Sequence, residues 1–332
     1  MSNQPPIEVP QGAIRLNTDS QKLEFFAQDR WYEFATDSPV LDGGGRGLVA
    51  GGNVPDQTNI IQFVTISIGG NSQDFGDLTA LTQAVPAATG SSTRGIIAGG
   101  QIFPATTNKI DFVTFSSTGN ASDFGDLTQA QRQAAGTGSQ TRGIFGGGED
   151  PSVSNKIDLI TISSTGNAND FGDLTVSRRI ASAASSPTRS LIVGGYDGSN
   201  ALNVIDFVIT SSTGNAQDFG DLTVARFSPN AVSSSTRAVM MGGRTPSHLN
   251  TIDFVTIASI GNSINFGDLT EAKGMAQNAS DCIRGLRMGG GNGDTNVIDY
   301  IMIVTTGDAV DFGDLITAQG EGSGLSNAHG GL

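Results

Sequence analysis

The stretch Arg142-Gly-Ile-Phe-Gly-Gly-Gly148 decides the fold, together with two segments that follow it. These are Lys156-Ile-Asp-Leu-Ile-Thr-Ile162 and Asp170-Phe-Gly-Asp-Leu-Thr175. The first and third segments are short, and the second alternates and is rich in β-branched residues, as a strand should be. A turn cluster at residues 163–169 separates the second from the third. Small and polar residues 177–187 then lead into the next copy of the first segment.

This unit occurs six times. One marker, Arg followed at +5 and +6 by Gly-Gly, begins at Arg46, Arg94, Arg142, Arg189, Arg237 and Arg284. The other marker, Phe-Gly-Asp, ends at Asp77, Asp126, Asp173, Asp221, Asp268 and Asp314. Both recur at intervals of 46 to 49 residues, and no stretch shows a long helical period. Four short strands per unit predict an all-β, six-bladed β-propeller. A solenoid is the rival, but its repeats are usually shorter and it needs capping units.

The two ends of the chain predict how the ring closes. Residues 316–330 match a first strand with no Arg strand after it, and Arg46 begins a unit with no first strand before it. We expect the C-terminal strand to pair with the strand at Arg46 and to complete the first blade. This pairing covers two sheet edges that would otherwise favour aggregation. Residues 43–332 are therefore predicted to form one propeller domain.

The repeated arginines and aspartates are interpreted as scaffold. Guanidinium and carboxylate can share a bidentate hydrogen bond, so we expect the six Arg to pair with repeated Asp. A ring of Asp that binds Ca²⁺ is the alternative, but the segments lack the dense Asp-x-Asp-x-Asp pattern of a calcium loop. We predict no metal and no cofactor.

Composition and charge exclude several classes of function. The 332 residues include 46 Gly and one Cys, and 18 Lys plus Arg against 32 Asp plus Glu give a net charge of −14. This balance argues against nucleic-acid binding and against docking on anionic membranes. No apolar run approaches the roughly 18 residues that span a bilayer, and the N-terminus has no secretory signal. No hydrolase, zinc or phosphate-loop motif is present, so we predict no enzyme. Carboxylates that meet at the central channel are the open alternative.

The loop after each Gly-Gly differs freely between units, at residues 53–58, 101–107, 149–154, 196–202, 244–249 and 291–295. Because all occupy one position in the blade, they must crowd one face of the disc. Loops on a rigid scaffold often carry recognition, although drift of surface loops would give the same variation. The candidate binding residues are Asp56, Phe103, Asp150, Tyr196, Asp197, Arg244 and His248.

Residues 1–42 form a separate arm. Three prolines near the start indicate an extended lead, and residues 12–34 read as a strand meander with turns at 17–21 and 27–30. A meander of this length has too little core to stand alone, so we expect it to dock and to make the assembly contact. Its candidate contact residues are Ile14, Leu16, Leu23, Phe25, Trp31 and Phe34.

The units resemble kelch repeats from about Arg46 to the C-terminus. The Gly-Gly pairs match, and the following aromatic position holds Phe63, Phe112, Phe207, Phe254 and Tyr300, with Leu159 departing. The Trp of the last kelch strand is replaced throughout by the Phe of Phe-Gly-Asp. The resemblance implies a divergent, kelch-like propeller.

The arm resembles a short module of bacteriophage structural proteins, particularly tail fibres and virion appendages. The shared pattern is Gly12-x-Ile14-Arg15-x-Asn17-Thr18-Asp19, then Lys22-Leu23-Glu24 and Trp31. With the propeller, the whole resembles virion proteins of marine and cyanobacterial phages. This implies a tail fibre or tail-associated protein of the virion, assembled in the host cytoplasm. Implied partners are other virion proteins, further copies of the chain (a homo-oligomer, with a trimer preferred), and a host-surface polysaccharide or protein. A capsid decoration or head-fibre protein, and a cellular kelch-type interaction module, stay open.

Overall fold

The computed structural model describes residues 10, 12–17, 22–27, 30–33, 45–54, 56–291 and 295–332. All regular elements in these ranges are β-strands. The chain divides into two compact units, Met1–Asp42 and Gly43–Leu332, and each is described by itself.

The first unit is a three-stranded antiparallel sheet. It contains β1 (Ile14–Asn17), β2 (Lys22–Ala27) and β3 (Arg30–Glu33), in the order β1-β2-β3. The register sets Ile14 opposite Phe25 and Leu16 opposite Leu23. The predicted meander is therefore confirmed. Phe34, a predicted contact residue, lies outside the described residues.

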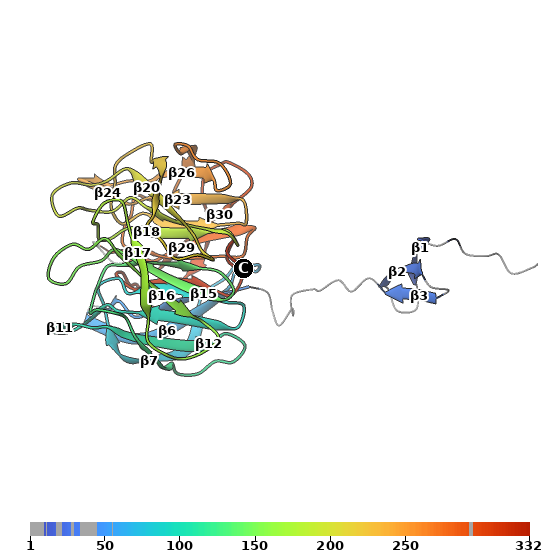
Figure 1. The fold of residues 1–332 in the computed structure, drawn as a ribbon, viewed down its shortest axis with the longest axis horizontal. Coiled ribbons are helices and arrows are strands. Elements are labelled where there is room, and N and C mark those ends of the chain that lie inside the picture. Colours follow the sequence, from blue (N-terminus) through green and yellow to red (C-terminus); the bar gives the residue numbers. More distant parts are fainter. Residues whose placement is uncertain are drawn as a thin grey trace, which may run out of the picture. The chain divides into compact units, whose positions relative to one another are not determined.

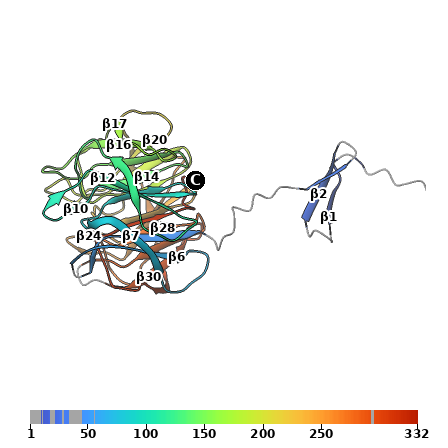
Figure 2. The same ribbon diagram turned by 90° about the horizontal axis from the view of Figure 1, so that it is seen from below.

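The second unit is a propeller of six four-stranded antiparallel blades, which confirms the predicted fold class (Figures 1 and 2). We number the blades one to six by the second strand, which starts at the repeated Arg. The innermost strands are β32 (Ser323–Ser326), β8 (Ala87–Gly90), β14 (Ala135–Gly138), β18 (Ser182–Ser185), β22 (Asn230–Ser233) and β28 (Gln277–Ser280). The second strands are β4 (Arg46–Ala50), β9 (Arg94–Ala98), β15 (Arg142–Gly146), β19 (Arg189–Val193), β23 (Arg237–Met241) and β29 (Arg284–Met288).

The two outer positions of each blade follow in the same order. The third strands are β6 (Asp56–Thr65), β12 (Lys109–Thr114), β16 (Lys156–Thr161), β20 (Val204–Ile209), β26 (Thr251–Thr256) and β30 (Val297–Met302). The outermost strands are β7 (Gln73–Thr82), β13 (Ser122–Asp126), β17 (Asn169–Asp173), β21 (Gln217–Asp221), β27 (Ile264–Asp268) and β31 (Val310–Asp314). Short strands between the second and third positions are β5 (Asn53–Val54), β10 (Gln101–Ile102), β11 (Ala105–Thr106), β24 (Arg244–Thr245) and β25 (Ser247–His248).

Both ends of the propeller segment build the first blade, as predicted. β32 pairs antiparallel with β4, from Ser323 opposite Ala50 to Ser326 opposite Gly47. The junction between the sixth and first blades packs like the others. One core cluster joins Leu286 and Phe312 of the sixth blade to Val64 of the first.

The disc has two faces with different chemistry. The loops between second and third strands define the hairpin face. The turns from innermost to second strand and from third to outermost strand define the turn face. The propeller segment begins on the turn face, where Asn327 near the C-terminus accepts the backbone N–H of Arg46 at 2.8 Å. Figure 1 shows β11 and β24 on one side of the disc and the C-terminus on the other.

The core lies between adjacent blades. Each Phe of Phe-Gly-Asp is at most 6% exposed. Five of these rings meet the third-strand aromatic of their own blade edge to face, with centroids 5.9–6.1 Å apart. The glycine that follows allows the next blade to approach. At Gly125 the φ angle is +148°, and a Cβ there would lie 2.5 Å from the carbonyl oxygen of Gly166.

The six repeated arginines do not pair with repeated aspartates, so this prediction is wrong. Each guanidinium instead donates to a backbone carbonyl of the next blade, just beyond its third strand. The pairs are Arg46–Phe115 (2.5 Å), Arg94–Ile162 (3.1 Å), Arg142–Thr210 (3.3 Å), Arg189–Ile257 (2.9 Å), Arg237–Ile303 (3.1 Å) and Arg284–Ile66 (3.2 Å). Five of the six also lie over the third-strand aromatic of their own blade, 4.2–5.2 Å from its centroid. The exception is Arg142, because Leu159 replaces the ring there. A carbonyl acceptor exists at every residue, so sequence alone could not indicate it.

The aspartates of Phe-Gly-Asp act through their backbone. In the described ranges their carboxylates form no ion pair with the repeated arginines. Each backbone N–H donates to the side chain of the turn in the next blade. The pairs are Asp77–Asn120 (3.1 Å), Asp126–Asn167 (3.1 Å), Asp173–Asn215 (3.1 Å), Asp221–Asn262 (3.0 Å), Asp268–Asp308 (3.0 Å) and Asp314–Asn71 (3.1 Å). The repeated turn thus caps the outer strand of the preceding blade.

A second set of aspartates, in the third strands, carries the buried polar contacts. Each accepts from a Thr of the preceding blade: Thr79–Asp111 (2.8 Å), Thr128–Asp158 (2.7 Å), Thr175–Asp206 (2.7 Å), Thr223–Asp253 (2.8 Å) and Thr270–Asp299 (2.6 Å). Burial raises the pKa of Asp158 and of Asp299. At the closing junction Ile316 replaces the Thr and Gln62 replaces the Asp, and the Ser72 hydroxyl donates to Gln62 at 2.7 Å.

Three of these aspartates also hold an arginine that is fully buried. Arg178 pairs with Asp206, Arg226 with Asp253 at 2.8 Å, and Arg287 with Asp299 at 3.3 Å. Burial lowers the pKa of all three guanidinium groups. The pairs offset this penalty. Arg287 lies opposite Asp299 within the sixth blade, and Arg178 and Arg226 join the connection that enters a blade to the third strand of that blade.

Candidate functional site

The hairpin face is built from six loops that are anchored in the same way. The first residue of each loop forms a β-bridge with a residue of the segment that enters the innermost strand. In every blade the next residue of that segment has a positive φ angle. The bridges are Asn53–Gly320, Gln83–Gln101, Arg132–Glu149, Arg179–Tyr196, Phe227–Arg244 and Gly274–Gly291. The Gly-Gly pair permits this close approach, since Gly243 has φ +105° and a Cβ there would lie 3.0 Å from the Phe227 carbonyl oxygen. Rigid anchors therefore carry loops of different sequence.

All seven predicted binding residues belong to these loops, but they differ in what they present to solvent. Phe103 is 73% exposed, and Asp56 and Asp150 are also exposed. The Asp197 carboxylate accepts the backbone N–H groups of Ser199 (2.7 Å) and Asn200 (2.6 Å), which lowers its pKa. Asp197 therefore shapes its own loop.

Polar side chains link the first four blades in one arc across the hairpin face. Gln57 donates to the Gln101 carbonyl at 3.2 Å, and Arg132 donates to the Gln101 side chain at 3.3 Å. Glu149 then holds two arginines, Arg132 at 3.5 Å and Arg179 at 2.6 Å. The contacts join hairpins that are far apart in the sequence.

Aromatic and cationic groups continue this arc into the fifth blade. The Arg179 guanidinium lies 5.4 Å from the Tyr196 ring centroid, and Tyr196 meets Phe227 edge to face at 5.4 Å. Arg244 lies over Phe227 at 5.9 Å. Beside this stack, burial lowers the pKa of His248, and the nearby positive charges of Arg244 and Lys273 lower it further. His248 is therefore neutral at pH 7.

Sequence reasoning missed six members of the arc. Three of them, Gln57, Gln101 and Glu149, lie within the variable loops. Arg132, Arg179 and Phe227 share one repeat position, four residues after the Thr of Phe-Gly-Asp-Leu-Thr. That position holds Gln83, Gly274 and Gly320 in the remaining blades. The residue at this repeat position varies as freely as the loops. That variation could have identified the position as part of the hairpin face.

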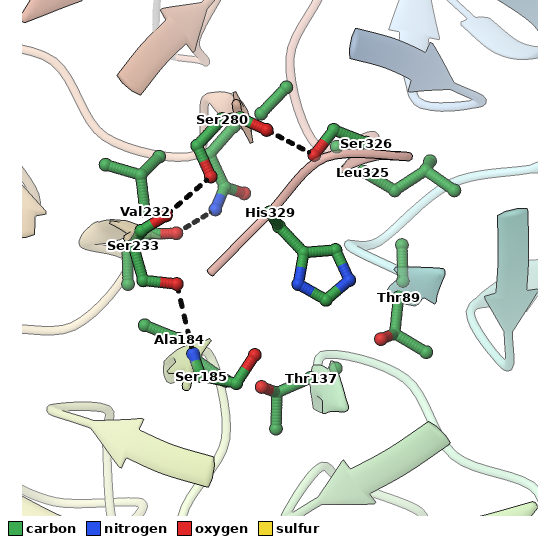
Figure 3. Close-up of a pocket in the computed structure, with 17 residues that line it drawn as sticks. Thr89, Thr137, Ala184, Ser185, Val232, Ser233, Ser280, Leu325, Ser326 and His329 are labelled. Atoms are coloured by element: carbon green, nitrogen blue, oxygen red, sulfur yellow. Dashed lines mark hydrogen bonds between the residues drawn. The ribbon is translucent and has the colours of Figure 1, made fainter. Parts of the chain in front are cut away.

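The central channel is narrow and lined by small side chains. It holds cavities of about 50 and 70 Å³ among the innermost strands. Figure 3 shows His329 from the C-terminal tail in the first of these, with Thr89, Thr137 and Ser185 around it. The His329 Nε2 lies 2.8 Å from the Gly90 carbonyl oxygen, and its Nδ1 accepts the N–H of Gly331 at 3.1 Å. The chain's own tail thus narrows the turn-face end of the channel.

A ring of strained backbone surrounds the other end of the channel. Six non-glycine residues have φ angles between +52° and +63°, a region that only glycine adopts easily. They are Ala84, Gln133, Ile180, Ser228, Met275 and Glu321. Backbone N–H groups link them from blade to blade, for example Ile180 to the Gln133 carbonyl at 2.8 Å and Ser228 to the Ile180 carbonyl at 2.7 Å. This ring fixes the bases of the hairpins relative to one another.

Carboxylates do not line the channel cavities, and the described ranges contain no group of three or more His, Cys, Asp or Glu placed to hold a metal. Those ranges also contain no helix long and apolar enough to cross a membrane. Comparison with known proteins finds no matching family model and no matching curated protein.

Proposed function

We propose that the protein is a structural protein of a bacteriophage virion, a tail fibre or tail-associated appendage. Its arm attaches it to other virion proteins, and its hairpin face is exposed to recognise a polysaccharide or protein of the host surface. The observation that carries this proposal is that the two faces of the propeller differ in what they hold. The propeller begins and ends on the turn face, and the sequence variation is gathered on the opposite face.

Two resemblances support the proposal. The Gly-Gly ends of the second strands and the aromatic of the third strands resemble those of kelch repeats, whose propellers present loops from a rigid frame. The arm carries the pattern of phage appendage modules from Gly12 to Trp31. Its β-meander exposes 62% of Ile14, and a three-stranded sheet of this size needs a further surface to cover it.

We propose a binding role without catalysis. The strongly buried acids Asp206, Asp253 and Asp299 are held in ion pairs with arginines. Side chains of the channel cavities are mainly Ala, Ser, Thr and Gly. The surface arc offers instead what recognition uses, which is guanidinium, amide and aromatic groups on fixed supports.

Adsorption of the phage to its host tests the recognition role. Purified protein should occupy the receptor and slow adsorption of intact phage. Phe103→Ser removes the most exposed aromatic of the hairpin face, so it should weaken this competition at least tenfold without lowering the melting temperature. Ser164→Ala, on the turn face of the third blade, is the matched control and should compete like the parent. Competition that is equal for all three proteins would refute recognition by the hairpin face.

Incorporation into particles tests the role of the arm. Ile14→Asp places a charge on an exposed apolar position and should abolish incorporation while the propeller stays folded. Fluorescence of Trp31, the single Trp of the chain, should shift to the blue when the parent assembles. Immunogold labelling of the particles then separates a tail location from a capsid location. Normal incorporation of Ile14→Asp would show that the attachment lies elsewhere.

A further inference from the structure

Arg244 differs from the other arginines of the propeller in how little of its guanidinium the protein itself uses. The propeller segment contains twelve arginines. In eleven of them a terminal guanidinium nitrogen contacts a carbonyl, amide or carboxylate oxygen of the chain. Within the described ranges Arg244 alone uses only its Nε, which donates to the Pro246 carbonyl at 2.9 Å. Both terminal nitrogens therefore remain for a partner outside the chain.

The frame beneath Arg244 holds its guanidinium in place. The backbones of Arg244 and Phe227 exchange two N–H to carbonyl hydrogen bonds, at 2.9 and 3.2 Å. The guanidinium lies over the Phe227 ring, 5.9 Å from its centroid. A planar donor fork that is fixed in advance loses little conformational freedom when it binds a carboxylate through two parallel hydrogen bonds. Arg244 is thus arranged for a carboxylate.

Two uncharged polar side chains flank this fork. His248 lies directly opposite Arg244 in the pair of β24 and β25. Tyr196 meets the Phe227 ring edge to face at 5.4 Å, and its backbone is bonded to that of Arg179 at 2.9 and 3.0 Å. In the part of the chain that the structure describes, neither the His248 ring nor the Tyr196 hydroxyl forms a hydrogen bond. An imidazole and a phenol can each exchange a hydrogen bond with a hydroxyl group of a ligand.

The charges around the fork favour an anion here, although the chain as a whole has a net charge of −14. The charges that lower the pKa of His248 are those of Arg244 and Lys273, and both are positive. The acids of the neighbouring hairpins are already engaged. Glu149 holds two arginines, and Asp197 accepts N–H groups of its own loop.

We propose that Arg244, His248 and Tyr196 bind one sugar-acid unit of an acidic polysaccharide. The carboxylate lies on the Arg244 fork, and ring hydroxyl groups bond the imidazole and the phenol. A uronic acid carries a carboxylate and hydroxyl groups on one rigid ring, whereas an acidic peptide side chain carries the carboxylate alone on a flexible stem. The inference rests on the proposed function, because it names the chemistry that the hairpin face recognises.

Calorimetric titration of the full chain with trimers of galacturonate, glucuronate and mannuronate tests the proposal. The parent should bind at least one of them, and it should not bind the methyl ester of that trimer. Arg244→Gln removes the fork and should weaken binding by about tenfold or more. Arg244→Lys keeps the charge without the fork, so it should bind little better than the Gln variant.

Lys156→Gln is the matched control, because it removes a positive charge from an exposed residue at the hairpin-face end of the third blade. It should bind like the parent, and all variants should keep the melting temperature of the parent. A parent that binds none of the three trimers overturns the proposal, as does an Arg244→Gln variant that binds like the parent. Equal binding of poly-L-glutamate or dextran sulfate also overturns it, since charge alone would then suffice.

The adsorption assay separates this inference from the proposed function. If the parent and Arg244→Gln slow adsorption of the phage equally, the hairpin face recognises the host without this sugar-acid site. If uronate binding depends on Arg244 but no protein slows adsorption, the sugar-acid site stands and recognition of the host is refuted.

Discussion

At the scale of the residue, equivalent positions in the six blades show which replacements the fold accepts. Where Thr79 and its equivalents bond an Asp of the next blade, the acid is buried and satisfied. The closing junction has lost both partners together, since Ile316 faces Gln62. A buried carboxylate without its donor is costly, whereas a neutral amide satisfied by Ser72 is not. An Asp beside Ile316 would lack the Thr hydroxyl donor, so the neutral Gln62 suits this junction better.

The contribution of each repeated arginine to the free energy of unfolding should depend on whether an aromatic ring lies beneath it. Arg94→Ala removes a charged donor from the carbonyl of Ile162 and a cation from the Phe112 ring, and it should lower the free energy of unfolding by about 1.5–3 kcal/mol. Arg142→Ala should cost about 0.5–1 kcal/mol less, because Leu159 offers no cation–π contact. Urea denaturation of both variants measures the difference. Equal costs would mean that the ring contributes nothing.

The buried Arg178 should tolerate Gln far better than Ala. Arg178→Ala leaves Asp206 charged and buried without its cation, at a cost of about 3–5 kcal/mol. Gln131 occupies the equivalent position beside Asp158, so Arg178→Gln should keep more than half of the lost stability. Thermal denaturation of the two variants compares them. A Gln variant as unstable as the Ala variant would show that the charge, and not the filled volume, is required.

At the scale of the element, the C-terminal tail replaces side chains that two blades lack. The innermost strands end in Ser185, Ser233, Ser280 and Ser326 in four blades, and in Gly90 and Gly138 in the other two. The Ser residues are linked, as in the bond from Ser326 to the Ser280 carbonyl at 2.6 Å. His329 fills the gap on the glycine side, and burial lowers its pKa.

Stability should therefore fall on mild acidification through His329. The unfolded chain binds a proton near pH 6.5 and the native site resists it, so the unfolded state holds more protons as the pH drops below that value. Between pH 7.5 and 5.5 the parent should lose more stability than His329→Asn, in urea titrations at both pH values. The raised pKa values of Asp158 and Asp299 act in the opposite direction and are common to both proteins. Identical losses would exclude His329 as the cause, since His248, whose pKa is also lowered, is present in both proteins.

At the scale of the whole molecule, several contacts run around the disc and close on themselves. The arginine-to-carbonyl contacts return from Arg284 to Ile66, and the caps of the outer strands return from Asp314 to Asn71. The backbone ring at the hairpin face returns from Val85 to the Glu321 carbonyl at 2.8 Å. Each blade is held on both sides, so the sixth junction stabilises all the others.

Two truncations should show how much of the stability comes from the closing strand β32 and how much from the tail in the channel. Removal of residues 327–332 leaves β32 paired with β4 and takes away only the tail, so it should cost about 1–3 kcal/mol. Removal of residues 316–332 also deletes β32 and exposes β4, which is a loss comparable with a domain's whole stability of about 5–15 kcal/mol. Calorimetry and light scattering should find a folded monomer for the first and aggregation for the second. A stable monomer lacking residues 316–332 would mean that the ring does not depend on this strand.

The sequence by itself determined the architecture, because the same strand and turn pattern occurs six times in the chain. The period, the Gly-Gly ends and the unmatched strand at each terminus were enough to predict six blades, the closing pair and the meander of the arm. The tertiary structure alone decided the partners of the repeated residues. Arg142 bonds a backbone carbonyl, which no side-chain pattern encodes, and Asp173 of the Phe-Gly-Asp in the same blade contributes its backbone N–H to the next blade. Likewise, Glu149 and Arg179 are 30 residues apart and meet only because neighbouring blades are set side by side. Strand pairing follows from local pattern, whereas contacts between blades depend on where the disc places each surface.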